Sequence, residues 1–148
     1  KNVSHRGYNN CILEFNDCRL HKSQILGELH KGFEVANEWL GATRLQVAST
    51  CLGRAERAME HAKQYAVDRY QFGQQIGKFQ GVSFKLADMA TELKAAELMI
   101  LEAGWKYDAG TVTDQDMAMA KLKATEVLAI WSLTNPDILR KPPILRAS

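Results

Sequence analysis

The chain has 148 residues, 46% of them apolar, and a net charge of +2 from 19 basic and 17 acidic residues. This length and composition suit one folded domain of ordinary size and exclude a disordered protein. The near balance of charge provides no dense basic surface, so nucleic acid is not an expected partner. Uncharged stretches reach only about ten residues, as at 127–136, whereas a membrane-spanning helix needs about 20 apolar residues.

The cysteines and the start of the chain bear on where the protein works. Cys11, Cys18 and Cys51 form no Cys-x-x-Cys pair, and no histidine lies at the spacing of a zinc site, so we expect no metal site. A reducing, intracellular compartment is the expected location. The chain begins with Lys1 and shows no signal-peptide region, and we expect it to start inside a longer protein.

The first thirty residues differ in pattern from the rest. Cys11, Leu13 and Phe15 alternate with other residues, and Asn16-Asp17 offers turn chemistry before Leu20. This pattern predicts a short hairpin or paired strand ends. Two short strands alone are marginal in water, so the segment 1–30 is expected to be the remnant of a β-domain and a linker.

Two long helices are predicted next, the first over about 33–70 and the second from about Val82 to Tyr107. Both stretches lack proline, and their apolar residues recur in steps of three and four, as on the buried side of a helix. The first such stripe is Leu45, Ala48, Leu52, Ala55, Met59, Ala62 and Ala66. The second is Val82, Leu86, Met89, Leu93, Ala96, Ile100, Ala103 and Tyr107.

The predicted helix ends follow ordinary capping rules. Gly110 is placed to end the second helix, and Thr113 to begin a third, with Asp114 and Asp116 in its first turn. The third stripe is Met117, Ala120, Ala124, Val127 and Trp131. The predicted fold is therefore mainly α, an up-and-down antiparallel bundle of three long helices over 31–131, preceded by a short β segment. Prolines interrupt the pattern in the tail, 132–148.

Two arginines are the candidates for chemistry, because the common catalytic and cofactor motifs are missing. Arg69 lies three residues after Ala66 and so continues the first buried stripe. It either binds an anion, with Phe72 and nearby apolar residues as a wall, or caps its own helix or pairs with an acid such as Asp68. Arg44, about seven helical turns away, is either a second anion-binding residue or a surface charge.

Residues 68–80 read Asp-Arg-Tyr-Gln-Phe-Gly-Gln-Gln-Ile-Gly-Lys-Phe-Gln and contain a specific spacing, Arg-x-x-Phe-Gly-x-x-Ile-x-x-Phe-Gln. Leu-Gly-Arg-Ala at 52–55 precedes this motif, and Leu-Ala-Asp-Met-Ala at 86–90 follows it. Together these motifs resemble the C-terminal helical domain of the acyl-CoA dehydrogenase family. Residues 13–33 resemble the end of that family's middle β-domain, so the resemblance covers about residues 8–130.

The resemblance implies a flavoenzyme that oxidises an acyl-CoA thioester to the 2-enoyl-CoA. A glutamate removes the α-proton, the β-hydrogen leaves as hydride to N5 of FAD, and an electron-transfer flavoprotein takes the electrons. It also implies a homo-oligomer, a dimer or tetramer built through the helical bundle, in the bacterial cytoplasm or mitochondrial matrix. The FAD of a neighbouring subunit would contact Arg69, Gln71, Phe72, Ile76, Phe79 and Gln80. The acyl-CoA would contact Gly41, Ala42, Thr43 and Arg44, with Arg44 near the CoA end.

The sequence departs from the family in its catalytic base. Most members carry a glutamate in a Tyr-Glu-Gly-Thr-like stretch beyond the third helix, and no such stretch is present here. A minority carry it at the position of Thr43, which cannot act as a carboxylate base. We therefore assign no catalytic residue in this chain and expect it to be inactive alone. Two alternatives stay open, a helical oligomerisation module without chemistry and a related flavin oxidase or monooxygenase on the same fold.

Overall fold

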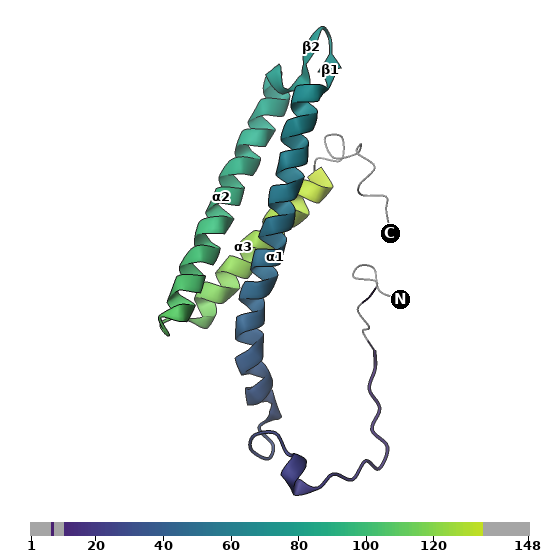
Figure 1. Cartoon of the computed structure of the whole chain (residues 1–148), viewed down its shortest axis with the longest axis vertical. Helices are drawn as coiled ribbons and strands as arrows, with labels where there is room; N and C mark the ends of the chain where they lie inside the picture. The colour runs from purple at the N-terminus through teal and green to yellow at the C-terminus, as the bar shows by residue number, and fades with distance from the viewer. Residues whose placement is uncertain (1–6, 8–10, 135–148) are drawn as a thin grey trace. The chain divides into compact units, whose positions relative to one another are not determined.

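The computed structural model describes Gly7 and residues 11–134. The chain divides into two compact units, Lys1–Val35 and Ala36–Ser148, which are described separately. Three long helices dominate: α1 at Gly32–Asp68, α2 at Gln80–Asp108 and α3 at Asp114–Thr134 (Figure 1). The predicted mainly α fold and its three long helices are confirmed. The helix α1 ends at Asp68, two residues earlier than expected, because the chain turns there into a small hairpin.

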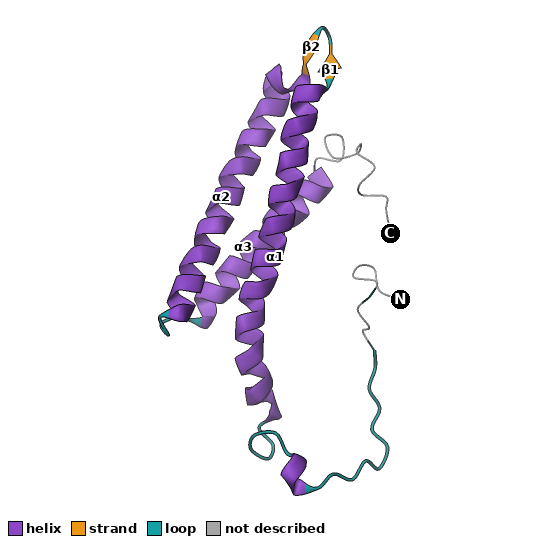
Figure 2. Cartoon of the chain, in the orientation of Figure 1, coloured by secondary structure: helices purple, strands orange, loops and turns teal. Residues whose placement is uncertain are grey.

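That hairpin connects α1 to α2. Strands β1 (Tyr70–Gln71) and β2 (Gln74–Gln75) pair antiparallel, with Tyr70 opposite Gln75 (Figure 2). The 3-10 helix η2, Ile76–Lys78, then leads into α2. Periodicity could not reveal strands of two residues, and the sequence predicted only an irregular connection here.

The three helices of the second unit share two apolar clusters. Each cluster takes side chains from α1, α2 and α3, so the three buried stripes face one another. Alanine supplies many of these positions, and small side chains allow helix axes to approach closely. The first cluster is Ala55, Met59, Met89, Leu93, Ala96 and Val127; the second is Ala48, Ile100, Ala103, Ala120 and Ala124.

The predicted stripes are confirmed over most of their length. Leu45, Leu52 and Leu86 are half-buried beside the clusters. Tyr107, however, is 49% exposed and does not belong to the core. It lies in the last turn of α2, beyond Ala103, the last buried residue of that helix.

The corner between α2 and α3 is closed by two capping motifs. Gly110 has φ of 68°, its N–H donates to the Tyr107 carbonyl, and the N–H of Thr111 donates to Lys106. This is the Schellman arrangement, which favours glycine at the left-handed position. Thr113 Oγ accepts from the N–H of Asp116, whose carboxylate in turn accepts from the Thr113 N–H and hydroxyl. Both predicted caps are confirmed.

The hairpin predicted within residues 11–20 is wrong. Over 11–31 the regular structure is the single 3-10 helix η1, Lys22–Gln24, although the chain does bend at Asn16-Asp17, where Asp17 has φ of 47°. Leu13 and Phe15 are 72% and 77% exposed. Alternating residues form a strand only beside a partner strand and against an apolar layer, and this segment has neither among the described residues.

Two further observations complete the description of the fold. No helix among the described residues is long and apolar enough to cross a membrane. Most of the predicted atypical tail, from residue 135 on, lies outside the residues that the structure describes.

Candidate functional site

The connection from α1 to α2, residues 69–80, holds all six residues predicted to contact a cofactor. Its backbone is fixed at several points: the N–H of Arg69 donates to Tyr65, and the Arg69 carbonyl accepts from the N–H of Ile76. Phe72 and Gly73, between the strands, have φ of 50° and 80°. Positive φ at both central residues defines the tight turn that matches the twist of a two-residue hairpin.

Arg69 is exposed, which corrects the prediction that it occupies a buried position. The stripe ends with Ala66 because α1 stops at Asp68, and the hairpin then carries Arg69 out of the helical register. Asp68 accepts a hydrogen bond from Gln64 Nε2 at 2.9 Å. No carboxylate of the described residues lies in salt-bridge range of the Arg69 guanidinium, so the pairing with Asp68 is not formed and the cation is available to an anion.

Two phenylalanine rings follow this arginine in the same connection. The rings of Phe72 and Phe79 meet edge to face, with centroids 6.3 Å apart and planes at 87°. Phe72 is 93% exposed, an unusual state for such a large apolar side chain, while Ile76 and Phe79 are half-buried. Gln71 and Gln80 are exposed at either side of the turn. The connection therefore presents a cation, apolar rings and amide groups within twelve residues.

Gly77 fixes the connection against α1. A Cβ at this position would lie 3.1 Å from the carbonyl oxygen of Ala66, a rigid backbone atom. The two glycines of the connection thus serve different purposes: Gly73 adopts a positive φ, whereas Gly77 allows a close approach to the backbone of α1.

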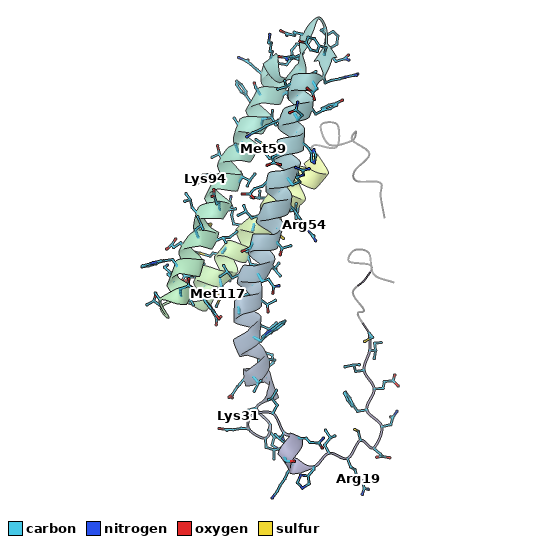
Figure 3. The ribbon with its side chains drawn as sticks, viewed as in Figure 1. Arg19, Lys31, Arg54, Met59, Lys94 and Met117 are labelled. Carbon is cyan, nitrogen blue, oxygen red and sulfur yellow. The ribbon has the colours of Figure 1, made fainter. Side chains whose placement is uncertain are left out.

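The predicted substrate segment, residues 41–44, lies inside α1 and faces α3 in part. Gly41 is buried, and a Cβ there would lie 3.2 Å from Met117 Cε, the side chain labelled on α3 in Figure 3. Ala42 is half-buried. The hydroxyl of Thr43 donates to the carbonyl of Trp39 at 2.8 Å, so it is engaged with its own helix.

Arg44 is neither a free surface charge nor fully buried. Its Nη1 lies 2.9 Å from Asp114 Oδ1, and the two side chains are 35% and 76% exposed. Sequence reasoning assigned Asp114 to the first turn of the third helix but gave no signal for this ion pair, because 70 residues separate the partners. Along α1, Arg44 and Arg69 are 25 residues apart, roughly 37 Å at 1.5 Å per residue, so they cannot hold the same group.

A second set of charges joins α2 to α3. Lys106 Nζ lies 2.8 Å from Asp116 Oδ1 and 2.7 Å from Glu102 Oε1. Hydrogen bonds from Lys106 and then from Thr113 lower the pKa of Asp116 to about 2, and bonds to Asp116 and Glu102 raise the pKa of Lys106. The Lys106–Asp116 ion pair holds the end of α2 against the start of α3. Within the described part of the chain, no cluster of histidine, cysteine or acidic residues could hold a metal ion.

Comparison with known proteins identifies the fold and its family. The family model "Acyl-CoA dehydrogenase, C-terminal domain" matches residues 30–132. The chain belongs to the acyl-CoA dehydrogenase family. It is 46% identical over 115 residues to a 3-(aryl)acrylate reductase of Clostridium sporogenes, covering 78% of this chain and 30% of that protein. It is 41% identical over 134 residues to the human mitochondrial short-chain specific acyl-CoA dehydrogenase, covering 90% and 32%.

A solved structure shows the same arrangement of helices. The butyryl-CoA dehydrogenase of Megasphaera elsdenii matches with a TM-score of 0.78 and 37% identity, over 84% of this chain and 33% of that one. The chain thus spans about a third of the length of the relatives it matches. This likeness confirms the resemblance read from the motif at 69–80.

Proposed function

We propose that the chain supplies the C-terminal helical part of an FAD-dependent acyl-CoA dehydrogenase. The reaction is the α,β-dehydrogenation of an acyl-CoA thioester to the 2-enoyl-CoA. The observation that carries the proposal is the connection 69–80, where an exposed arginine without a salt bridge to any described residue is followed three positions later by an exposed aromatic ring. A connection that served packing alone would need neither group.

The residues of this connection suit the two halves of FAD. The guanidinium of Arg69 offers a planar set of donors that matches a phosphate, and no carboxylate among the described residues occupies them, so they can bind the pyrophosphate. Gln71 and Gln80 provide further polar groups, while Phe72, Ile76 and Phe79 provide apolar contact. The bound flavin would supply the redox chemistry, accepting the hydride from the β-carbon.

The residues of α1 would meet the other ligand. Gly41, Ala42 and Thr43 would line the acyl-CoA site, and Arg44 would lie near the CoA end with its permanent charge toward a phosphate. Thr43 would not act as the base that removes the α-proton, since it is not a carboxylate and its hydroxyl donates to the carbonyl of Trp39. The α-proton would pass to a glutamate outside these 148 residues, and the chain alone would be inactive.

The partners follow from the same proposal. An electron-transfer flavoprotein would accept the electrons, and the enzyme would act as a dimer or tetramer, with Arg69 reaching the FAD of a neighbouring subunit. The bundle supports association, because Leu98, Leu101 and Trp105 are 54%, 60% and 70% exposed at helical spacing along α2. The bacterial cytoplasm or mitochondrial matrix would be its location.

A second candidate is the reverse reaction, reduction of a 2-enoyl substrate on the same site. The similarity to a 3-(aryl)acrylate reductase favours it. The same fold is also compatible with a flavin oxidase or monooxygenase, and with an oligomerisation module without chemistry. Anaerobic mixing separates them. The flavin of a dehydrogenase or an oxidase loses its colour with an acyl-CoA, and only the oxidase consumes oxygen rapidly once air is admitted. The flavin of a reductase, first reduced with a chemical reductant, regains its colour as it passes its two electrons to the enoyl compound, and the module carries no flavin.

The decisive experiment replaces Arg69 in the product of the complete reading frame. The Arg69→Ala variant should bind FAD about ten- to a hundredfold more weakly, because a hydrogen bond to a charged group contributes about 1.5–3 kcal/mol. Arg54→Ala is the matched control, since Arg54 is an exposed arginine of α1 away from the connection (Figure 3). Flavin fluorescence on dilution measures retention. Equal retention in both variants would refute the role of Arg69.

A further inference from the structure

The first turn of α3 contacts the proposed substrate segment at two points. Asp114 holds the guanidinium of Arg44 at 2.9 Å, and one turn of helix later Met117 packs against Gly41, where even a Cβ would come within 3.2 Å. A polar and an apolar contact therefore connect the same stretch of α1 to the same end of α3. The position of α3 fixes the position of residues 41–44.

The ion pair leaves most of the arginine available. A guanidinium has five N–H donors, and within the described residues Asp114 takes one of them, through Nη1 alone. The Arg44 side chain is 35% exposed, so its remaining donors can reach solvent or a ligand. A bidentate contact would have used both arms of the guanidinium fork, whereas this one leaves the other arm free of Asp114.

The partner Asp114 lies at a fixed place in the backbone. Asp114 opens α3, and a carboxylate there is favoured by the positive end of the helix dipole. Two residues later, Asp116 is locked by the Thr113 cap and by Lys106 of α2. The backbone that carries the acid therefore belongs to a corner tied to α2, while the Asp114 carboxylate, 76% exposed, accepts its hydrogen bond from Arg44.

We propose that Asp114 is a positioning residue for acyl-CoA binding: it orients the guanidinium of Arg44 toward an anionic group of the substrate, a phosphate of the CoA moiety. The inference rests on the proposed function for the role of Arg44. Without Asp114 the long arginine side chain would sample many rotamers, and substrate binding would then have to restrict them, which lowers the affinity. With Asp114 present, the Arg44 side chain already loses this conformational entropy when the protein folds.

The test compares charge removal with charge retention in the FAD-loaded product of the complete reading frame. Asp114→Asn should raise the KM for acyl-CoA about three- to fivefold, the range expected when an exposed ion pair is lost, with little change in kcat or FAD content. Asp114→Glu keeps the charge and should restore most of the affinity. Calorimetric titration with CoA itself should show the same loss without turnover.

Asp116→Asn is the matched control, because it removes a neighbouring ion pair of the same turn that faces Lys106 and not Arg44. It should lower stability and leave the KM near the parent value. A KM for Asp114→Asn no higher than for Asp116→Asn overturns the inference. So does a lowered KM, which would make Asp114 a competitor of the substrate.

Arg44→Ala separates this inference from the function on which it rests. A raised KM for Arg44→Ala with an unchanged one for Asp114→Asn refutes the positioning role alone and leaves the proposed substrate site intact. An unchanged KM for Arg44→Ala removes the arginine from the site and refutes both claims about it. Loss of flavin reduction by every acyl-CoA in the parent protein refutes the proposed function itself.

Discussion

Gly110, at the end of α2, offers a sharp test of how this bundle is closed. Its φ of 68° lies in the left-handed region, and nothing lies within 4 Å of a Cβ placed there. Gly110→Ala therefore introduces no clash, and the backbone angle alone decides the outcome. The left-handed conformation costs a non-glycine residue about 1–2 kcal/mol, offset in part by about 0.4–1 kcal/mol from the stiffer unfolded chain. We expect a net loss of about 1 kcal/mol.

Gly53 is the matched control, since it lies within α1 and its surroundings are equally empty. Gly53→Ala should stabilise the protein by about 0.5–1 kcal/mol, because alanine is the better helix former. Urea denaturation followed by circular dichroism should therefore shift the two midpoints in opposite directions, by about 0.3–1 M each. Gly110→Asn should lose less than Gly110→Ala, because asparagine tolerates this conformation. Shifts of the same sign for Gly53→Ala and Gly110→Ala would refute the reasoning.

Two further predictions concern the core and the corner. Met59 is 5% exposed in the first apolar cluster, so Met59→Ala should lower the free energy of unfolding by about 2–4 kcal/mol. Met119 is 43% exposed, and Met119→Ala should change the free energy of unfolding by less than about 0.5 kcal/mol. Urea titrations measure both changes. The Asp116 carboxyl has a pKa of about 2 when folded against 3.8 ordinarily. The ionised carboxylate therefore stabilises the folded state above about pH 4, and this contribution is lost as the pH falls toward 2. In thermal melts, the melting temperature of Asp116→Asn should fall less between about pH 4 and about pH 2 than that of the parent. An equal fall in both proteins would contradict the assignment.

The bundle could be predicted from the sequence because it rests on repeating local patterns. The steps from Ala48 through Ala55 to Ala66 match the helical period, and the structure buries all three. The helix ends could be predicted as well. The backbone of Gly110 suits the left-handed position after a helix, and the side chain of Thr113 suits the N-cap position. Such signals act within one or two helical turns and do not depend on the rest of the molecule.

The N-terminal segment shows where the same reasoning fails. Alternation at Leu13 and Phe15 describes side chains that could share a face, yet a strand also requires a partner for its backbone hydrogen bonds. The described residues offer none, and both side chains are exposed. Alternation therefore predicts a strand only where the rest of a sheet is present, and no strand lies beside 11–20 among the described residues.

The two arginines show the complementary limit for the candidate site. The stripe placed Arg69 at a core position, but α1 ended one residue before it, and an exposed guanidinium resulted. For Arg44 the cation could be predicted and its partner could not, because Asp114 is 70 residues away and lies beyond the turn between α2 and α3. Spacing can assign a residue type to a helix face, whereas the charge that faces it depends on how the helices turn. The charge that would orient Arg44 is therefore set by the corner between α2 and α3, and no local spacing in the sequence reveals it.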